Sequence, residues 1–154
     1  MTQFIGDHIC KLDAKGRLLL PSAIKKQLSP DDSDRFVIKK DIYEKCLILY
    51  TMGEWERQNK LIRERLNPYN KEHNRFLREF FKGTAEVALD ASNRILVPKR
   101  LLDLIDADKE LVLAGQFDKI EIWSRKAYDA IGDNQDEFAG LADKILGGNQ
   151  KTAE

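Results

Sequence analysis

One segment of this chain occurs twice, and the repeat limits the folds open to it. Residues 12–21 read LDAKGRLLLP and residues 89–98 read LDASNRILVP, with six of ten positions identical. The same offset of seventy-seven positions pairs Phe4 with Phe81 and Gly6 with Gly83. Internal repeats indicate a duplicated structural unit. The sequence therefore predicts two copies of one strand pattern, which together form a pseudo-twofold domain.

A second match lies downstream at a smaller offset. Residues 47–50 (LILY) align with residues 120–123 (IEIW), and Trp55 aligns with Tyr128. This offset is four residues smaller than the first. The second copy therefore lacks about four loop residues, and we expect the gap to lie near residues 29–34.

The composition allows a folded domain and gives no support to metal or membrane binding. The chain has 154 residues, 42% of them hydrophobic, enough for one compact domain or two small interlocked ones. No apolar run reaches the ~20 residues that span a bilayer, and the N-terminus lacks a signal-peptide pattern. Cys10 and Cys46 are read as buried thiols in a reducing compartment. His8 and His73 lack ligand-spaced neighbours, so we expect no metal and no cofactor.

The formal net charge is zero, but the charges are unevenly distributed. Acidic residues concentrate in residues 31–34, 103–108 and 129–137. Basic residues dominate the first 27 positions, where only Asp7 and Asp13 oppose Lys11, Lys15, Arg17, Lys25 and Lys26. A neutral total with a local basic face is typical of a protein that binds an anion in one orientation.

The residue pattern predicts an α+β fold that is rich in strands. We expect strands over residues 4–12, 18–20, 35–40 and 46–50, and helices over residues 22–28, 52–66 and 71–82. The second copy repeats the order strand, turn, strand, helix, strand, strand as far as residue 123. Residues 133–154 are expected to form a flexible tail.

Four apolar residues lie close together on the helix expected over residues 71–82. Phe76, Leu77, Phe80 and Phe81 occupy neighbouring positions one turn apart. They either form an exposed patch or are buried against the other copy or another subunit. We expect burial.

The repeated segment contains a tight turn with a defined backbone requirement. A three-residue hairpin loop usually combines a type I turn with one left-handed residue. Gly16 stands at that position in the first copy. Asn93 replaces it in the second, and asparagine tolerates left-handed backbone better than most non-glycine residues. The substitution preserves the turn, which supports the alignment.

Each turn also carries an Asp–x–x–x–Arg pair, Asp13 with Arg17 and Asp90 with Arg94. In one interpretation the arginines only close their own hairpins, a role worth ~0–1 kcal/mol for an exposed pair. In the other, each aspartate orients a guanidinium outward, where its planar fork can meet a phosphate or a guanine edge. We favour the second interpretation.

An enzyme with Asp13 and Asp90 as an acid–base pair is a third possibility. Each aspartate has an arginine four residues later, which would keep it ionised and prevent the two from sharing a proton. The sequence lacks a glycine-rich phosphate loop, a nucleophile elbow and a metal-ligand set. We therefore predict that the protein is not an enzyme.

These motifs resemble the MraZ family of bacterial transcriptional regulators, which belongs to the SpoVT–AbrB class. The likeness rests on the paired turns, on CLILY (residues 46–50) before EWE (54–56), and on GQFDKIEIW (115–123). It implies SpoVT–AbrB repeats at residues 7–54 and 84–127, joined by a helical connector at residues 55–83. It further implies a tandem AbrB-like swapped-hairpin β-barrel with flanking helices, and subunits assembled in a ring.

The resemblance also implies a function and its partners. Family members bind short direct repeats in double-stranded DNA upstream of their own division and cell-wall gene cluster, usually to repress it. They associate with the nucleoid in the cytoplasm, and no membrane is involved. The main alternative is an antitoxin-like module, in which an AbrB-type barrel binds a partner protein through an extended tail.

Carried over residue by residue, Arg17 and Lys15 match the DNA-contacting turn of the family, and Arg94 matches its second copy. The chain departs from the family at Ser92 and Asn93, where Gly-Arg is commoner and no lysine equivalent remains. We expect this turn to bind phosphate less strongly. The expected phosphate contacts are Lys11, Lys15, Lys25 and Lys26, and the expected partial compensation at the second turn comes from Lys99 and Arg100.

Overall fold

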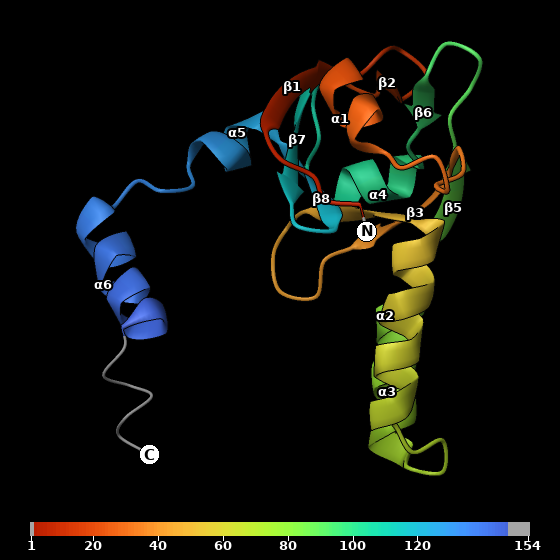
Figure 1. Ribbon diagram of the computed structural model, residues 1–154, viewed down its shortest axis with the longest axis vertical. Coiled ribbons are helices and arrows are strands. Elements are labelled where there is room, and N and C mark those ends of the chain that lie inside the picture. The colour runs from red at the N-terminus through yellow and green to blue at the C-terminus, as the bar shows by residue number, and fades with distance from the viewer. Residues whose placement is uncertain (1, 148–154) are drawn as a thin grey trace.

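The computed structural model describes residues 2–147 and has an α+β fold (Figure 1). Its eight strands are β1 (Asp7–Lys11), β2 (Arg17–Leu19), β3 (Arg35–Lys40), β4 (Leu47–Thr51), β5 (Ala85–Ala88), β6 (Arg94–Leu96), β7 (Glu110–Gln116) and β8 (Lys119–Ser124). Its helices are α1 (Ser22–Gln27), α2 (Met52–Arg65), α3 (Lys71–Phe81), α4 (Lys99–Leu104), α5 (Arg125–Asp129) and α6 (Gln135–Leu146).

The two copies exchange strands with each other. One sheet has the order β1-β7-β8-β4-β3-β5, and β2 pairs with β6 in a second sheet. The first strand of each copy therefore pairs with the third strand of the other, as β1 with β7 and β5 with β3. The predicted α+β class with exchanged hairpins is confirmed. Closure of the two sheets into a barrel stays a prediction.

The strand register shows the pseudo-twofold axis directly. In β4 and β8, Ile48 faces Glu121, and the flanking pairs are related by exchange of the two copies. In β2 and β6 the central pair is Leu18 with Ile95. Each central pair joins two residues that are equivalent in the two copies. The pseudo-twofold axis therefore passes through both pairs, and so through both sheets.

The loop difference between the copies differs from the sequence prediction. The pairs His8–Leu113 and Ala85–Ile38 are equivalent, so β3 and β7 are offset by seventy-five positions rather than seventy-three. Two residues are thus missing between α4 and β7. Two more are missing from the second β-hairpin, where Phe117 and Asp118 replace residues 42–45. The gap expected near residues 29–34 therefore accounts for only two of the four residues, and the other two are lost from the β-hairpin loop, which can shorten without disturbing the strand register.

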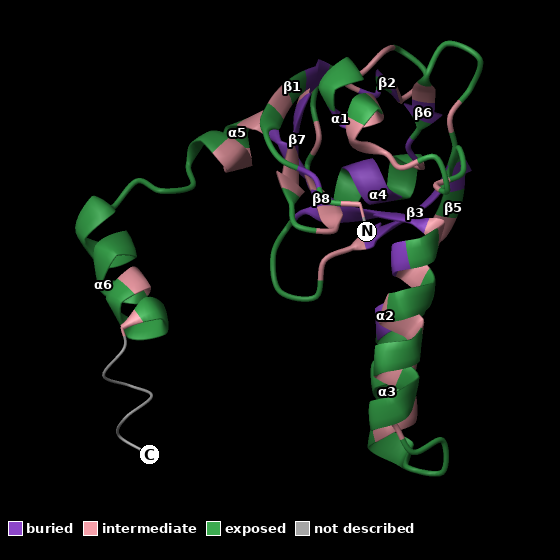
Figure 2. Cartoon of the chain, viewed as in Figure 1, coloured by how far each residue is buried: buried purple, intermediate pink, exposed green. Residues whose placement is uncertain are grey.

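The core lies between the sheets and the short helices α1 and α4 (Figure 2). Alternate residues of β4 face opposite sides, as strand geometry requires. Leu47 and Leu49 join the main core, with Ile24 of α1 and Leu101 of α4. On the outer side, Ile48 and Tyr50 form a second cluster with Cys46 and Trp123. Strand β4 is buried on both faces, which is consistent with its lack of charged residues.

Helices α2 and α3 form an antiparallel hairpin that projects from the strands (Figure 1). The indole of Trp55 stacks on Phe80, with ring centroids 6.2 Å apart. The Nζ of buried Lys39 lies 4.0 Å from the Phe80 centroid. The α3 phenylalanines therefore pack against α2 and β3 rather than against the second copy, and burial against another subunit stays a prediction. Phe76 and Phe81 stay partly exposed.

The segment after β8 contains two helices. Thr51 caps α2 and Ser124 caps α5, and these two residues occupy equivalent positions in the two copies. Helix α6 follows and stands away from the rest of the chain (Figure 1). The flexible tail expected over residues 133–154 thus contains a regular helix, and residues 148–154 lie outside the described part.

Candidate nucleic-acid interface

The first repeated turn is organised by one carboxylate. The Oδ1 of Asp13 accepts hydrogen bonds from the backbone N–H groups of Lys15 and Arg17, both at 2.9 Å. Its Oδ2 accepts a third from Arg17 Nε at 2.7 Å. Gly16 has a φ of 85°, the left-handed conformation that the sequence predicts. One aspartate therefore fixes both the backbone of the turn and the stem of the guanidinium.

The second turn repeats this arrangement. The Oδ1 of Asp90 accepts from Ser92 N at 2.8 Å and from Arg94 N at 2.9 Å. Its Oδ2 accepts from Arg94 Nε at 3.2 Å. Asn93 has a φ of 60° and matches Gly16. The geometry is thus a property of the Asp–x–x–x–Arg motif, in which asparagine can replace glycine.

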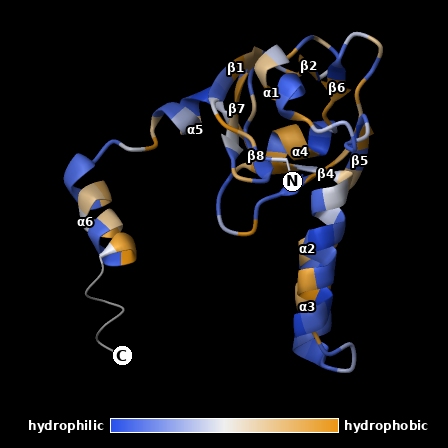
Figure 3. Ribbon diagram, in the orientation of Figure 1, coloured by the Kyte–Doolittle hydropathy of each residue, from blue (hydrophilic) through white to orange (hydrophobic). Residues whose placement is uncertain are grey.

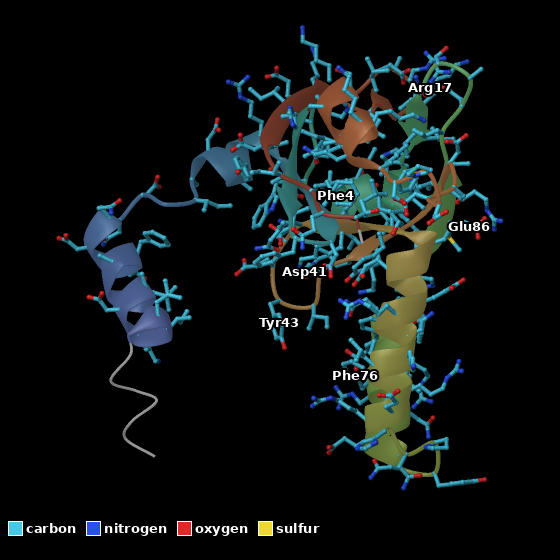
Figure 4. The ribbon with its side chains drawn as sticks, viewed as in Figure 1. Phe4, Arg17, Asp41, Tyr43, Phe76 and Glu86 are labelled. Atoms are coloured by element: carbon cyan, nitrogen blue, oxygen red, sulfur yellow. The ribbon has the colours of Figure 1, made fainter. Side chains whose placement is uncertain are left out.

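The two turns lie side by side. Val97 N donates to Gly16 O at 3.0 Å, and the equivalent bond runs from Leu20 N to Asn93 O at 2.9 Å. These bonds continue the β2–β6 pairing into the turns. Figure 4 shows Arg17 at the end of the molecule opposite the tip of the α2–α3 hairpin. Both arginines are therefore presented at one shared end.

Each guanidinium keeps part of its donor set available. The side chains of Arg17 and Arg94 are 27% and 35% exposed. Arg94 Nη1 also lies 4.0 Å from Asp13 Oδ2, so one carboxylate sits between both arginines. Within the described chain, the Arg17 Nη groups make no hydrogen bond. They remain free for a phosphate or a base edge, whose bidentate recognition the planar fork favours.

Both aspartates are held ionised. The backbone N–H of Arg17 lowers the pKa of Asp13, and the Arg17 side chain and Lys15 N–H add to the effect. The backbone N–H of Arg94 does the same for the pKa of Asp90. An acid–base pair needs one carboxyl group that stays protonated near neutral pH. This geometry opposes that requirement.

The first turn borders an open hollow of about 1040 Å³. Four lysines line it, together with Asp13 and three further acids from α4, the segment before β7 and the start of β7. The lysines are Lys11, Lys15, Lys99 and Lys109. Lys109 was missed in the sequence, because the β1–β7 pairing and the bond from Leu12 N to Lys109 O bring it to this turn from a distant part of the chain.

The pseudo-twofold axis relates these lysines to uncharged or acidic residues. Lys15 corresponds to Ser92, Lys11 to Ala88, Lys99 to Ser22 and Lys109 to Asp34. The two turns therefore have the same backbone conformation, and each carries an arginine, but they differ in the number of lysines around them. The sequence indicated this difference only at Ser92.

The expected groupings of the other basic residues change in the structure. Lys99 lies beside the first turn, not the second, because β2 and β6 are antiparallel and β6 leads directly into α4. It also forms an ion pair with Asp103 at 3.5 Å. Lys25 pairs with Asp34 at 3.4 Å, and Asp34 O accepts from Leu89 N beside the second turn. Lys26 and Arg100 are exposed on α1 and α4.

The described residues show no cluster that fits a metal ion. Cys10 and Cys46 are free and buried. Burial raises the pKa of Cys10 to about 11 and that of Cys46 to about 12, so both stay protonated near neutral pH. Among residues 2–147, no helix has the length and apolar character of a membrane span.

The fold and the turns define a class of protein: an α+β chain of two exchanged copies that presents two Asp–x–x–x–Arg turns at one end. A family model described as "MraZ protein, putative antitoxin-like" matches residues 3–79 and 80–146. The chain therefore belongs to the MraZ family.

Relatives cover the chain almost completely. A protein of Christiangramia forsetii is 42% identical over 148 residues, which cover 96% of this chain and 95% of the relative. One from Flavobacterium psychrophilum is 38% identical, with 96% and 94% covered. One from Phocaeicola vulgatus is 34% identical, with 96% of each covered. All three are named "Transcriptional regulator MraZ".

Proposed function

We propose that this protein is a DNA-binding transcriptional regulator that reads sequence with its paired turns. The observation that carries the proposal is the pairing of the two turns by backbone hydrogen bonds. This pairing presents Arg17 and Arg94 at one end of the molecule, with their Nε atoms held by aspartate. The names of the relatives support it, because they describe regulators of transcription and not enzymes.

Arg17 is the proposed base-reading residue. The major groove, about 12 Å wide, admits a two-stranded β-ribbon, and the most frequent specific contact is a bidentate arginine on guanine. Such a contact discriminates against a wrong base by ~1–3 kcal/mol. Since Asp13 holds the Nε edge of Arg17, the two Nη groups point away as the reading edge.

The lysines around the first turn are the proposed phosphate contacts. Lys11, Lys15 and Lys99 surround this turn, whereas Ala88, Ser92 and Ser22 surround the second. Phosphate contacts fix the register on the duplex without carrying sequence information. We expect the first turn to dominate affinity and the second to add mainly the contacts of Arg94. Lys25 and Lys26 serve the second turn in this scheme, and Arg100 extends the basic surface.

The small footprint of one subunit calls for several linked subunits. A ring of identical subunits would place successive pairs of turns on successive DNA repeats, and linkage raises their effective concentration. Neighbours in a ring are related by rotation, so the expected operator consists of direct repeats rather than a palindrome. The proposed target lies upstream of the protein's own division and cell-wall gene cluster, with repression as the outcome and the nucleoid in the cytoplasm as the location.

The test compares Arg17→Ala with a matched control in a binding titration on the DNA just upstream of this gene. The control is Arg75→Ala, because Arg75 is highly exposed on α3 and, among the described residues, pairs with Glu79 on the same helix. Arg17→Ala should weaken specific binding by roughly tenfold to a hundredfold, which corresponds to ~1–3 kcal/mol. Arg75→Ala should bind like the wild type. A folded Arg17→Ala protein with wild-type affinity would reject the assigned role.

A further inference from the structure

Helix α6 carries exposed apolar residues that the proposed DNA contacts leave unused. Phe138, Leu141 and Ile145 are 61%, 51% and 65% exposed. Their spacing places them on one side of the helix, with Asp136, Gly140 and Asp143 on the other. Figure 3 shows hydrophobic segments along α6, and Figure 1 shows that the helix stands apart from the strands. An amphipathic helix in this position lacks a partner for its apolar side.

The α2–α3 hairpin has a groove that suits such a helix. The groove has a volume of about 340 Å³, enough for one or two large apolar side chains. It is lined by Ile62, Arg65, Leu66, Glu72, His73 and Phe76. Phe76 is 40% exposed at this site. Amphipathic helices bind hydrophobic grooves through anchors spaced three, four and seven residues apart, the spacing of Phe138, Leu141 and Ile145.

The charges of the two elements are complementary. Residues 129–146 carry five Asp or Glu and one lysine. Residues 52–82 carry eight Lys or Arg and five Glu. Within the described residues, Arg65 and Lys71 near the groove form no ion pair, and neither does Glu137 on α6. Opposite charges at the rim of an apolar contact steer association and fix its orientation.

The groove of the same chain is a poor target for α6. Only residues 130–134 separate α5 from α6, and five extended residues span at most ~18 Å. Figure 1 shows α6 and the α2–α3 hairpin well separated. A second copy of the chain brings its own hairpin without this restriction.

We infer that α6 of one protein molecule docks its apolar side into the α2–α3 groove of a neighbouring molecule of the same protein. Each molecule then donates one helix and accepts another, which is a head-to-tail contact that can close into a ring. A twelve-residue helix covers less than the ~800 Å² that each partner of a stable complex usually buries. The contact therefore strengthens a larger assembly and does not make a dimer alone. It is independent of DNA, so its failure leaves the reading role of Arg17 intact.

The decisive experiment is photocrosslinking between two isotopic forms of the full chain. A benzoylphenylalanine at position 138 is placed in unlabelled protein, which is mixed with ¹⁵N-labelled wild type without DNA. We expect crosslinked peptides that join position 138 to labelled residues 62–76. The control carries the same group at position 136, on the opposite side of α6, and should give no such peptide. Crosslinks confined to one isotopic form, crosslinks between two α6 helices, or no crosslink would each overturn the inference.

A second measurement uses two neighbouring substitutions. Leu141→Asp puts a charge on the apolar side of α6, whereas Gly140→Asp puts the same charge on the polar side, where a Cβ meets open space. Leu141→Asp should weaken self-association by roughly tenfold or more, because a buried leucine contributes ~1.5–3 kcal/mol. Gly140→Asp should leave the sedimentation behaviour unchanged. Equal behaviour of the two variants, or a wild type that is monomeric at every concentration, would overturn the inference.

Discussion

Replacement of Gly16 tests whether backbone conformation holds the first turn. The φ of 85° lies in the left-handed region, which costs a residue with a Cβ ~1–2 kcal/mol. A Cβ at this position would lie 3.5 Å from Val97 O and 3.6 Å from a Leu102 methyl carbon, which are ordinary contacts. The penalty is therefore conformational. A β-branched side chain raises it further, so Gly16→Val should cost ~2 kcal/mol or more.

The matched control is Gly16→Asn, because Asn93 occupies the equivalent position with a φ of 60°. Asparagine tolerates this conformation, and loss of glycine restricts the unfolded chain by ~0.4–1 kcal/mol, which offsets part of the penalty. Near-neutral stability is expected. At ~2–4 °C per kcal/mol for a chain of this size, Gly16→Val should lower the Tm by roughly 4–8 °C.

Thermal unfolding by circular dichroism measures both variants, and the DNA titration follows on the folded fraction. Gly16→Val should also lose affinity, because the turn positions Arg17. A Gly16→Val protein as stable as the wild type would refute the conformational argument. If Gly16→Asn were as unstable as Gly16→Val, contact with Val97 and Leu102 would be the cause instead.

Two further predictions concern charge. The pKa values of Asp13 and Asp90 are lowered in the fold, so the stability that these ionised groups add is complete above the unfolded pKa of ~4 and is lost as the pH falls through the lower folded values. In an acid titration, Asp13→Asn should therefore lose stability less steeply below pH ~4 than the wild type. Identical acid profiles of the two proteins would contradict this. Lys99→Ala should reduce the slope of log affinity against log salt by about one, the value for one phosphate contact. Lys126→Ala on α5, an exposed lysine outside the proposed interface, is its control, and equal slopes for both would exclude Lys99 from the interface.

The local structure could be predicted from the sequence because its determinants are local. The motif Asp–x–x–x–Arg fixes both turns through bonds within five residues, so Gly16 and Asn93 could be aligned before any fold was known. Strand and helix positions also agreed within a few residues. The exchange of β1 and β5 between the copies came only with the family resemblance, because strand alternation does not identify the pairing partner.

Long-range placement explains the errors at the site. The positions of Lys99 and Lys109 depend on the antiparallel registers of β2 with β6 and of β1 with β7. Neither contact leaves a periodic signal in the sequence. Helix α6 did leave one, since Asn134 accepts from Glu137 N as a helix cap and two acids occupy the first turn. The glycines and polar residues nearby led to its interpretation as a tail.

The exchange of strands also means that neither half of the chain can complete a sheet alone. A protease cut in the connection between α2 and α3, where Tyr69 is 95% exposed, would separate the two copies in sequence. Each fragment would still supply strands that the other requires, and the β4–β8 and β2–β6 pairs would hold the fragments together. The two halves of the fold thus interlock like the subunits of a strand-exchanged dimer, and co-expressed halves should reconstitute it by complementation.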